Sequence, residues 1–491
     1  MEKTSVSQPS ESAISIEYIQ IVDFKFNLIN NLMNSNIEIA NDIGIKTGAN
    51  IPYLLSDNEE KNIIVRVGVQ PSDEIRKDFM EKEKVNSGVD LCLVLDISVS
   101  MTDVIEEDNV EYGSRFEVAK KAVESLIKNS SDEDNLSLIT YNDLPKVVFK
   151  NISGSDKDFM LSELNKVTAS GNTNISAAIR EARILMKEEV SDKVKKIIFV
   201  TDGIPTCDTE EDGIREAEYL GDDSISLDCL GVGNKDIKFS FLEKLSIPSN
   251  GRTDIISNGE EAVKIFHNLF DKSKQVIMTN VKLRLTEISP LVRITDHYRG
   301  TPEKKYLGKA KISSDREYVI NIGQIEKDQL YNFYFNVTVS SRVNLKGPFN
   351  IMKTSVEYCI PDMYGDNVKT NANVVVVEFG TDSRRSRYRV GDIERNFKMV
   401  EIKRYEDEIE EDSKEGNDAR VINNLQRIIS ICEYLKNEEL ITGYKGILEK
   451  YREEKKLDMS KMNENRNTST KIGDDGLINL PLDIESIFED Q

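Results

Sequence analysis

The sequence predicts an α/β domain with a doubly wound, mainly parallel sheet, flanked by a β-sandwich and followed by a C-terminal helical hairpin. Three observations predict this arrangement. Across residues 89–270, short apolar runs alternate with amphipathic helical segments, as in a parallel sheet covered by helices on both faces. On both sides of this segment, near Val65 and again after Lys274, apolar and polar residues alternate as in half-buried strands. Across residues 390–454, apolar residues recur at helical spacing.

The α/β segment opens with the apolar run LCLVLD at residues 91–96, which predicts a buried strand. Ser114 and Glu117 have the spacing of a capping box, so a helix is expected to begin there. A second amphipathic helix is expected at residues 175–185. Further buried strands are expected at residues 136–141, 196–201, 225–233 and 253–257. In sheets of this kind, ligands bind outside the carboxyl ends of the strands.

The flanking segments have the two-residue period of strands with one buried face. Their alternating apolar residues are Ile63, Val65, Val67 and Val69 before the α/β segment, and Val281, Leu283, Leu285, Phe333, Phe335, Val337 and Val339 after it. We therefore expect the α/β domain to be inserted into, or flanked by, one sandwich with strands from both sides.

The predicted parts follow from these changes of period. They are an N-terminal segment that contributes sandwich strands (1–83), the α/β domain (84–274), the sandwich (275–385), a helical region (386–457), and a disordered linker with an acidic-apolar tail (458–491).

The composition excludes several classes of function. Acidic residues outnumber basic ones by 87 to 65 in a chain of 491 residues, and this field repels nucleic acid. No apolar stretch approaches the roughly 20 residues of a membrane-spanning helix, and the N-terminus lacks the basic and apolar regions of a secretory signal. The five scattered cysteines suit a reducing compartment. We expect a cytoplasmic protein with no nucleic-acid partner and no membrane span.

Three short motifs place oxygen donors at the carboxyl ends of predicted strands. The run DISVS supplies Asp96, Ser98 and Ser100 after the first strand. A GNTN loop before a helix offers the hydroxyl of Thr173, and the turn TDG after a later strand offers Asp202. Hard divalent cations prefer oxygen ligands, so these residues are candidate metal ligands. Ser, Thr and Asp at such positions also serve as helix caps, which is the alternative for each motif alone.

In order and spacing, DISVS, SGNTN and VTDG resemble the three pieces of the metal-ion-dependent adhesion site of von Willebrand factor A (VWA) domains. The resemblance covers about residues 88–272 and is to the intracellular bacterial or archaeal type. It implies that Ser98, Ser100 and Thr173 are direct or switchable ligands, while Asp96 and Asp202 act mainly through coordinated water. It also implies that a Glu or Asp carboxylate of a protein partner completes the metal's coordination.

An all-oxygen site with few carboxylates favours Mg²⁺ or Mn²⁺ over Ca²⁺. The resemblance further implies a partner in a multiprotein assembly, such as one built around an ATPase or a kinase. We therefore expect a metal-dependent protein-interaction module or scaffold.

Two alternatives remain open. One is a structural scaffold that binds through its sandwich, helices or tail, in which the metal only stiffens the loops. The other is a Mg²⁺-dependent phosphatase with Asp96 as phosphoryl acceptor. That chemistry usually needs a second Asp two residues later, where this chain has Ser98. The sequence contains no P-loop, no Gly-x-Ser-x-Gly turn and only two histidines, so we expect no enzymatic activity.

Three further segments have no assigned role. The acidic stretch at residues 103–108 fits a solvated loop or a second cation site. The four arginines at residues 384–389 fit an anionic partner, pairing with the acidic segment 406–415, or simple solvation. The apolar residues of the tail at 480–488 fit a docking peptide, and they equally fit packing on the chain's own domains.

Overall fold

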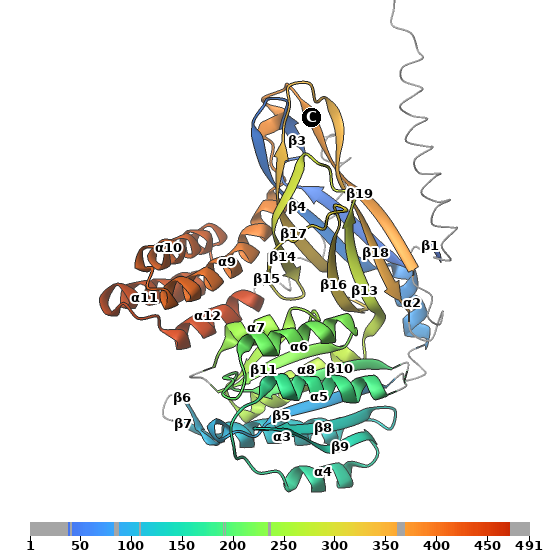
Figure 1. Cartoon of the computed structure of the whole chain (residues 1–491), viewed down its shortest axis with the longest axis vertical. Coiled ribbons are helices and arrows are strands. Elements are labelled where there is room, and N and C mark those ends of the chain that lie inside the picture. The colour runs from blue at the N-terminus through green and yellow to red at the C-terminus, as the bar shows by residue number, and fades with distance from the viewer. Residues whose placement is uncertain are drawn as a thin grey trace, which may run out of the picture.

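The computed structural model describes residues 38–39, 42–82, 88–107, 110–189, 191, 193–233, 237–360 and 369–471. Figure 1 shows three parts. An α/β domain lies at the bottom of the view, a tall β-sandwich stands on it, and a group of C-terminal helices packs at the side of both.

The α/β domain is built on a six-stranded sheet with the order β12-β11-β10-β5-β8-β9. Its strands are β5 (Val89–Asp96), β8 (Asn135–Tyr141), β9 (Pro145–Ser153), β10 (Val194–Thr201), β11 (Ser226–Val232) and β12 (Thr253–Ile256). Neighbouring strands are parallel except for β8 and β9. The chain passes from β5 to β8 on one side and later returns to β10 on the other. The strand order therefore reverses at β5, where doubly wound sheets bind their ligands.

Helices cover both faces of this sheet. One face carries α3 (Arg115–Asn129), α4 (Lys157–Asn165) and α8 (Gly259–Ser273), and the other carries α5 (Ile175–Glu188), α6 (Glu210–Asp222) and α7 (Phe239–Ser246). Leu91, Leu93 and Leu95 of β5 pack toward α3 and α8, whereas Cys92 and Val94 pack toward α5. Because β5 is apolar at every position before Asp96 except Asp90, both of its faces can be buried.

The sandwich takes strands from both sides of the α/β domain, as expected. One sheet has the order β15-β14-β17-β4-β2, and the other has β1-β19-β18-β13-β16 with β3 paired to β19. Before the α/β domain come β1 (Glu38–Ile39), β2 (Ile43–Ala49), β3 (Tyr53–Leu55), β4 (Glu60–Pro71) and the helix α2 (Asp73–Lys82). After it come β13 (Val276–Thr286), β14 (Val292–Thr301), β15 (Lys305–Lys309), β16 (Tyr318–Glu326), β17 (Tyr331–Ser340), β18 (Gly347–Cys359) and β19 (Lys369–Gly380).

The pairing of β4 with β17 shows the insertion directly. In this antiparallel pair, Val67 lies opposite Phe333 and Val65 opposite Phe335. The alternating residues that predicted these strands all belong to one hydrophobic core between the two sheets. The α/β domain is therefore inserted into the sandwich.

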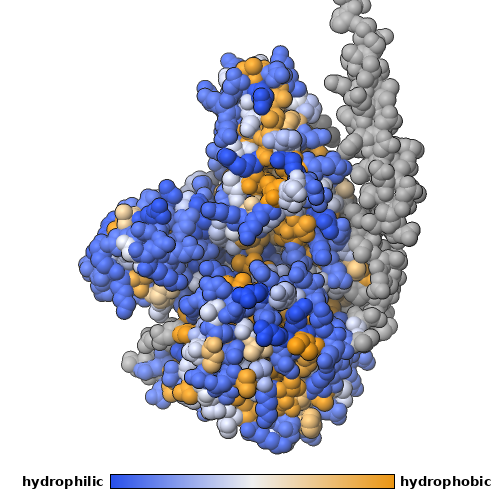
Figure 2. Space-filling view, in the orientation of Figure 1, coloured by the Kyte–Doolittle hydropathy of each residue, from blue (hydrophilic) through white to orange (hydrophobic). Residues whose placement is uncertain are grey.

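The C-terminal region contains more helix than the predicted hairpin. The hairpin itself is present as α10 (Asp418–Leu435) and α11 (Glu438–Glu454), and α9 (Gly391–Lys414) and α12 (Met459–Lys471) flank it. The prediction of a disordered linker is wrong for residues 459–471, which form α12. Gly443 of α11 allows a close approach to α12, since a Cβ there would lie 2.2 Å from Asn465 Oδ1. Figure 2 shows that this helical region presents a mostly hydrophilic surface in that view.

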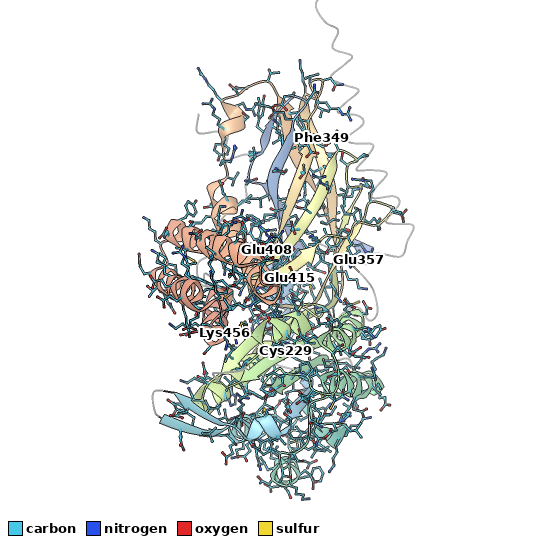
Figure 3. The ribbon with its side chains drawn as sticks, turned by 60° about the vertical axis from the view of Figure 1, so that its left-hand side comes forward. Cys229, Phe349, Glu357, Glu408, Glu415 and Lys456 are labelled. Atoms are coloured by element: carbon cyan, nitrogen blue, oxygen red, sulfur yellow. The ribbon has the colours of Figure 1, made fainter. Side chains whose placement is uncertain are left out.

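The three parts meet at one junction. In Figure 3, side chains crowd the region between Cys229 of β11 and Glu408 of α9, while Phe349 and Glu357 mark the sandwich above it.

All five cysteines are free, and Cys92, Cys229 and Cys432 are buried. Among the described residues, no helix combines the length and the apolar character needed to cross a membrane. The predicted tail at residues 480–488 lies outside the described residues.

Candidate metal site

Three loops meet at the carboxyl end of β5, where the strand order reverses. The loop after β5 is tied to the GNTN loop by two backbone bonds: Ser170 N donates to Ile97 O at 2.6 Å, and Val99 N donates to Gly171 O at 3.0 Å. Thr201, the last residue of β10, donates its hydroxyl to Asp96 Oδ2 at 2.7 Å. The structure therefore brings the three predicted motifs to one edge of the sheet.

Asp96 is fully buried at the centre of this edge. Its Oδ1 accepts the backbone N–H of Ser98 at 2.8 Å, and its Oδ2 accepts hydroxyls from Thr201 and from Tyr141, the latter at 3.2 Å. Burial raises the pKa of Asp96 to about 6, and the nearby charge of Asp202 acts in the same direction. A divalent cation at this edge would favour the charged carboxylate.

Ser98 and Ser100 present their hydroxyls side by side, with the two Oγ atoms 3.0 Å apart. Ser98 is buried and Ser100 is partly exposed. Residues Val99–Thr102 form a single 3₁₀ turn, with Ser98 at its N-cap. In an extended strand, side chains two residues apart lie on the same face but about 7 Å apart, so the turn brings these two hydroxyls together.

Thr173 is also buried, and its backbone is fixed by the loop that follows β10. Its N–H donates to Thr206 Oγ1 at 2.8 Å, and its carbonyl accepts the N–H groups of Thr206 and Cys207. Its own hydroxyl makes no hydrogen bond to any residue that the structure describes. This uncommitted oxygen is available as a ligand.

Asp202 is fully buried and is paired with Arg115, whose Nη1 lies 3.1 Å from Asp202 Oδ2. Arg115 is the first residue of α3, after the capping box of Ser114 and Glu117 that the sequence predicted. Gly233, with φ +126°, leaves room for the guanidinium, since a Cβ there would lie 2.8 Å from Arg115 Nε. The fold therefore places the positive charge of Arg115 next to Asp202, the second carboxylate of the site.

The donor set fits a hard divalent cation. The Ser98 and Ser100 hydroxyls are hydrogen-bonded to each other at 3.0 Å, which is also about the separation of neighbouring ligands of an octahedral Mg²⁺ with bonds of about 2.1 Å. The candidate ligands are two carboxylates and three hydroxyls, without a soft ligand. The described part of the chain contains no group of three or more His, Cys, Asp or Glu side chains that could hold a metal ion, so a cation here would depend on the hydroxyls.

Sequence reasoning located the oxygen donors but missed the residues that hold them. Thr201 and Tyr141 end the strands on either side of β5, so their approach to Asp96 follows from strand register, which the sequence does not show. Nothing in the sequence indicated a role for Arg115 except its position directly after a helix cap.

The structure describes part of the acidic stretch 103–108 and all of the arginine run 384–389. Within residues 103–108, Asp103 is exposed and lies 3.9 Å from Arg115, and Asp108 lies outside the described residues. Of the four arginines at 384–389, Arg385 pairs with Glu378 at 2.7 Å and stacks over Tyr53. All four arginines are exposed, which agrees with the solvated alternative, and Arg385 pairs with Glu378 of β19 rather than with residues 406–415.

Comparison with known proteins identifies the α/β domain. The family model of the von Willebrand factor type A domain matches residues 91–204. The structure of a von Willebrand factor type A protein from Catenulispora acidiphila superposes with a TM-score of 0.70 at 15% identity, over 89% of this chain and 98% of that one. At this identity the likeness shows the fold, and it extends beyond the α/β domain.

Two curated relatives match at the sequence level. The uncharacterized protein sll0103 of Synechocystis sp. is 25% identical over 48% of this chain and 57% of its own length. The uncharacterized protein YfbK of Escherichia coli is 21% identical over 46% of this chain and 39% of its own length. The chain thus spans about half the length of the curated relatives that it matches.

Proposed function

Since the chain contains a von Willebrand factor type A domain, a kind of module that generally mediates protein interactions, we propose that it binds a protein partner through a divalent metal ion. The ion is Mg²⁺, with Mn²⁺ or Ca²⁺ as alternatives, and its ligands are Asp96, Ser98, Ser100, Thr173 and Asp202. An exposed Glu or Asp of the partner supplies the last ligand.

The paired hydroxyls of Ser98 and Ser100 are the observation that carries this proposal. Hydroxyls are neutral ligands, so they satisfy the geometry of the ion while neutralising none of its charge. One carboxylate, Asp202, already shares its charge with Arg115. An ion held in this way remains attractive to one more anionic oxygen, which is the chemistry of an acidic partner.

The position of Asp96 argues against the phosphatase alternative. A phosphoryl-accepting carboxylate must reach its substrate. Asp96 is instead fully buried, and both of its oxygens accept hydrogen bonds from Ser98, Thr201 and Tyr141. These contacts suit a carboxylate that orients a ligand or a coordinated water.

Calorimetric titration with Mg²⁺ tests the metal site. We expect the double variant Ser98→Ala/Ser100→Ala to lose at least about tenfold in affinity, the lower limit for removing groups that support a metal. Thr102→Ala is the matched control, because its hydroxyl lies in the same turn but donates to Val99 O. Equal far-ultraviolet circular dichroism of the three proteins establishes that they are folded alike.

Capture of partners from native lysate, in Mg²⁺ and in EDTA, then tests the interaction. A partner that is held by wild type and Thr102→Ala in Mg²⁺, and is lost in EDTA and in the double variant, supports recognition at the metal. A partner retained under all conditions would instead favour the scaffold alternative, in which the sandwich, the helices or the tail bind.

A further inference from the structure

Exposed apolar side chains surround the proposed metal site. Val99 is 59% exposed, Leu144 is 73% exposed and Ile204 is 40% exposed. Val99 lies between the two serine ligands, and the N–H of Ile204 points to Asp202 Oδ1 at 3.4 Å. Single exposed apolar residues are normal on a surface, but each of these three lies on a loop that carries a proposed metal ligand or is hydrogen-bonded to such a loop. We call Val99, Leu144 and Ile204 the apolar rim.

Leu144 belongs to this rim because its turn is held against the GNTN loop. Its N–H donates to Asn142 Oδ1, and Asn142 Nδ2 in turn donates to Ser170 O at 2.8 Å. The chemistry of the site is therefore composite. It fits a peptide that offers a carboxylate to the ion and apolar side chains to the loops on either side.

The chain itself contains such a peptide. Residues 480–488 read LPLDIESIF, in which Asp483 lies between Leu482 and Ile484, and Glu485 follows directly. We propose that residues 477–491 dock on the metal site of the same molecule, with Asp483 or Glu485 supplying the carboxylate. This inference rests on the proposed function, and it names a ligand that competes with the external partner.

The anchoring of α12 places the start of this segment within reach. Lys471, the last residue of α12, pairs with Asp254 of β12 at 2.6 Å. Asp254 lies opposite Leu230, and Thr201 lies opposite Gly231, so Asp202 is about two residues, or about 7 Å, nearer the carboxyl edge. From β12 to β5 is three strand spacings, or about 14 Å. The twelve residues from 472 to 483 can span about 40 Å.

The other end of α12 also lies close to the site. Asn463 Nδ2 donates to Ile237 O at 2.6 Å, on the segment that leads into α7. A Cβ on Gly203, the residue after Asp202, would lie 3.3 Å from Leu242 of α7. The helix that precedes the tail is therefore packed along the same corner of the α/β domain as the Asp202 loop.

Carboxylates near the apolar rim make the docking dependent on the ion. Asp103 and Asp143 are exposed beside the site, and the tail contributes further carboxylates. Without the ion, like charges repel, whereas a divalent cation reverses the sign of the local field. By linkage, the tail must then strengthen metal binding by the factor by which the metal strengthens docking.

Hydrogen exchange of the full chain in Mg²⁺ and in EDTA tests the inference. In Mg²⁺ we expect the amides of residues 477–491 to exchange at least about fivefold more slowly than in EDTA, the lower end of coupling between linked sites. The variant Asp483→Asn/Glu485→Gln should lose this protection and bind Mg²⁺ about fivefold more weakly. The control Asp474→Asn/Asp475→Asn removes two charges from the residues just before the docking segment and should retain both properties.

The outcomes separate this inference from the proposed function. If Mg²⁺ binds in a manner that requires Ser98 and Ser100 but the tail is not protected, docking of the tail is wrong and the metal-dependent interaction stands. If Mg²⁺ does not bind, the proposed function itself fails, and docking with it. Protection that rises with protein concentration would overturn docking within one molecule.

Discussion

At the scale of single residues, the pairing of Arg115 with Asp202 determines how the site behaves without metal. Asp202 is fully buried, and Arg115 is its ion-pair partner at 3.1 Å. A buried carboxylate that loses its partner is costly, because the charge has been removed from water without compensation. A divalent ion at the site would provide Asp202 with a second counter-charge.

We therefore predict that Arg115→Met destabilises the chain by about 3 kcal/mol in EDTA and by clearly less in Mg²⁺. Urea unfolding under the two conditions measures this difference. Arg180→Met is the matched control, since Arg180 is exposed and its ion pair with Glu216 should contribute less than about 1 kcal/mol. An equal loss of stability with and without Mg²⁺ would show that the ion does not act on Asp202.

His297 makes a second residue-scale prediction, in the sandwich. Its Nδ1 lies 3.0 Å from Gly308 O and its Nε2 lies 2.7 Å from the hydroxyl of Tyr318. Burial lowers the pKa of His297 to about 4, despite the opposing effects of Gly308 O and Asp296. Between this value and the ordinary one near 6.5, the unfolded chain binds a proton that the folded chain does not. Stability is therefore complete above about pH 6.5 and falls as the pH drops toward 4.

The loss across that range should be about 3 kcal/mol, from the size of the shift. His297→Gln keeps a polar side chain but cannot titrate, so its stability should vary less between pH 6.5 and pH 4. Denaturant midpoints across this range compare the two proteins. Parallel pH profiles for wild type and His297→Gln would contradict the assignment.

At the scale of elements, α12 is held by charge rather than by an apolar face. Arg466 donates to Glu243 of α7 at 2.7 Å and to Glu410 of α9 at 3.1 Å, and all three side chains are buried. Burial alone would raise the pKa of Glu243, but Arg466 and Lys403 hold it at about 2. The three helices thus share one ion-pair network.

Removing Arg466 should release α12. We predict that Arg466→Met costs about 3–5 kcal/mol, because it leaves several carboxylates buried together without their counter-charge. The amides of residues 459–471 should then exchange faster than those of α10. Lys461→Met is the control, since Lys461 is exposed on the same helix. Unchanged protection of α12 in Arg466→Met would show that its other contacts suffice.

This network also explains why α12 was not predicted. Its buried residues include Asn463, Arg466, Ser469 and Thr470, so the segment has no apolar period. Their partners on α7 and α9 are distant in sequence, and only the folded chain brings them together. By contrast, Val65 of β4 and Phe335 of β17 show the strand period in the sequence itself. Elements built on apolar periodicity were predictable, and the element built on buried ion pairs was not.

The candidate site divides in the same way. Asp96, Ser98 and Ser100 follow an apolar run directly, so their place at a strand end could be predicted from local sequence. Arg115 and Thr201 act on carboxylates that other strands or loops provide. Their roles depend on strand register and on the space left by Gly233, which is information that no local pattern contains.

At the scale of the whole molecule, the α/β domain is joined to the sandwich at a polar junction as well as by its two chain connections. Arg252, beside β12, places Nη2 2.9 Å from both carboxylate oxygens of Glu326 on β16. Gln324 Nε2 donates to Lys195 O at 2.9 Å, and Arg299 Nη2 donates to Gly251 O at 3.2 Å. Such contacts couple the stability of the two parts, because each buried charge needs its partner across the junction.

We therefore predict that the wild-type chain unfolds in calorimetry as one cooperative unit, and that Arg252→Met separates the α/β domain and the sandwich into two transitions. Cooperativity between domains requires a favourable interface, and this substitution removes its best-defined ion pair while leaving Glu326 largely buried. Arg293→Met is the control, because Arg293 and its partner Glu60 are exposed within the sandwich. Two transitions already present in wild type would show that the junction does not couple the parts.

Coupling matters for the proposed function, since a partner that binds at the metal would then also stabilise the sandwich and α12.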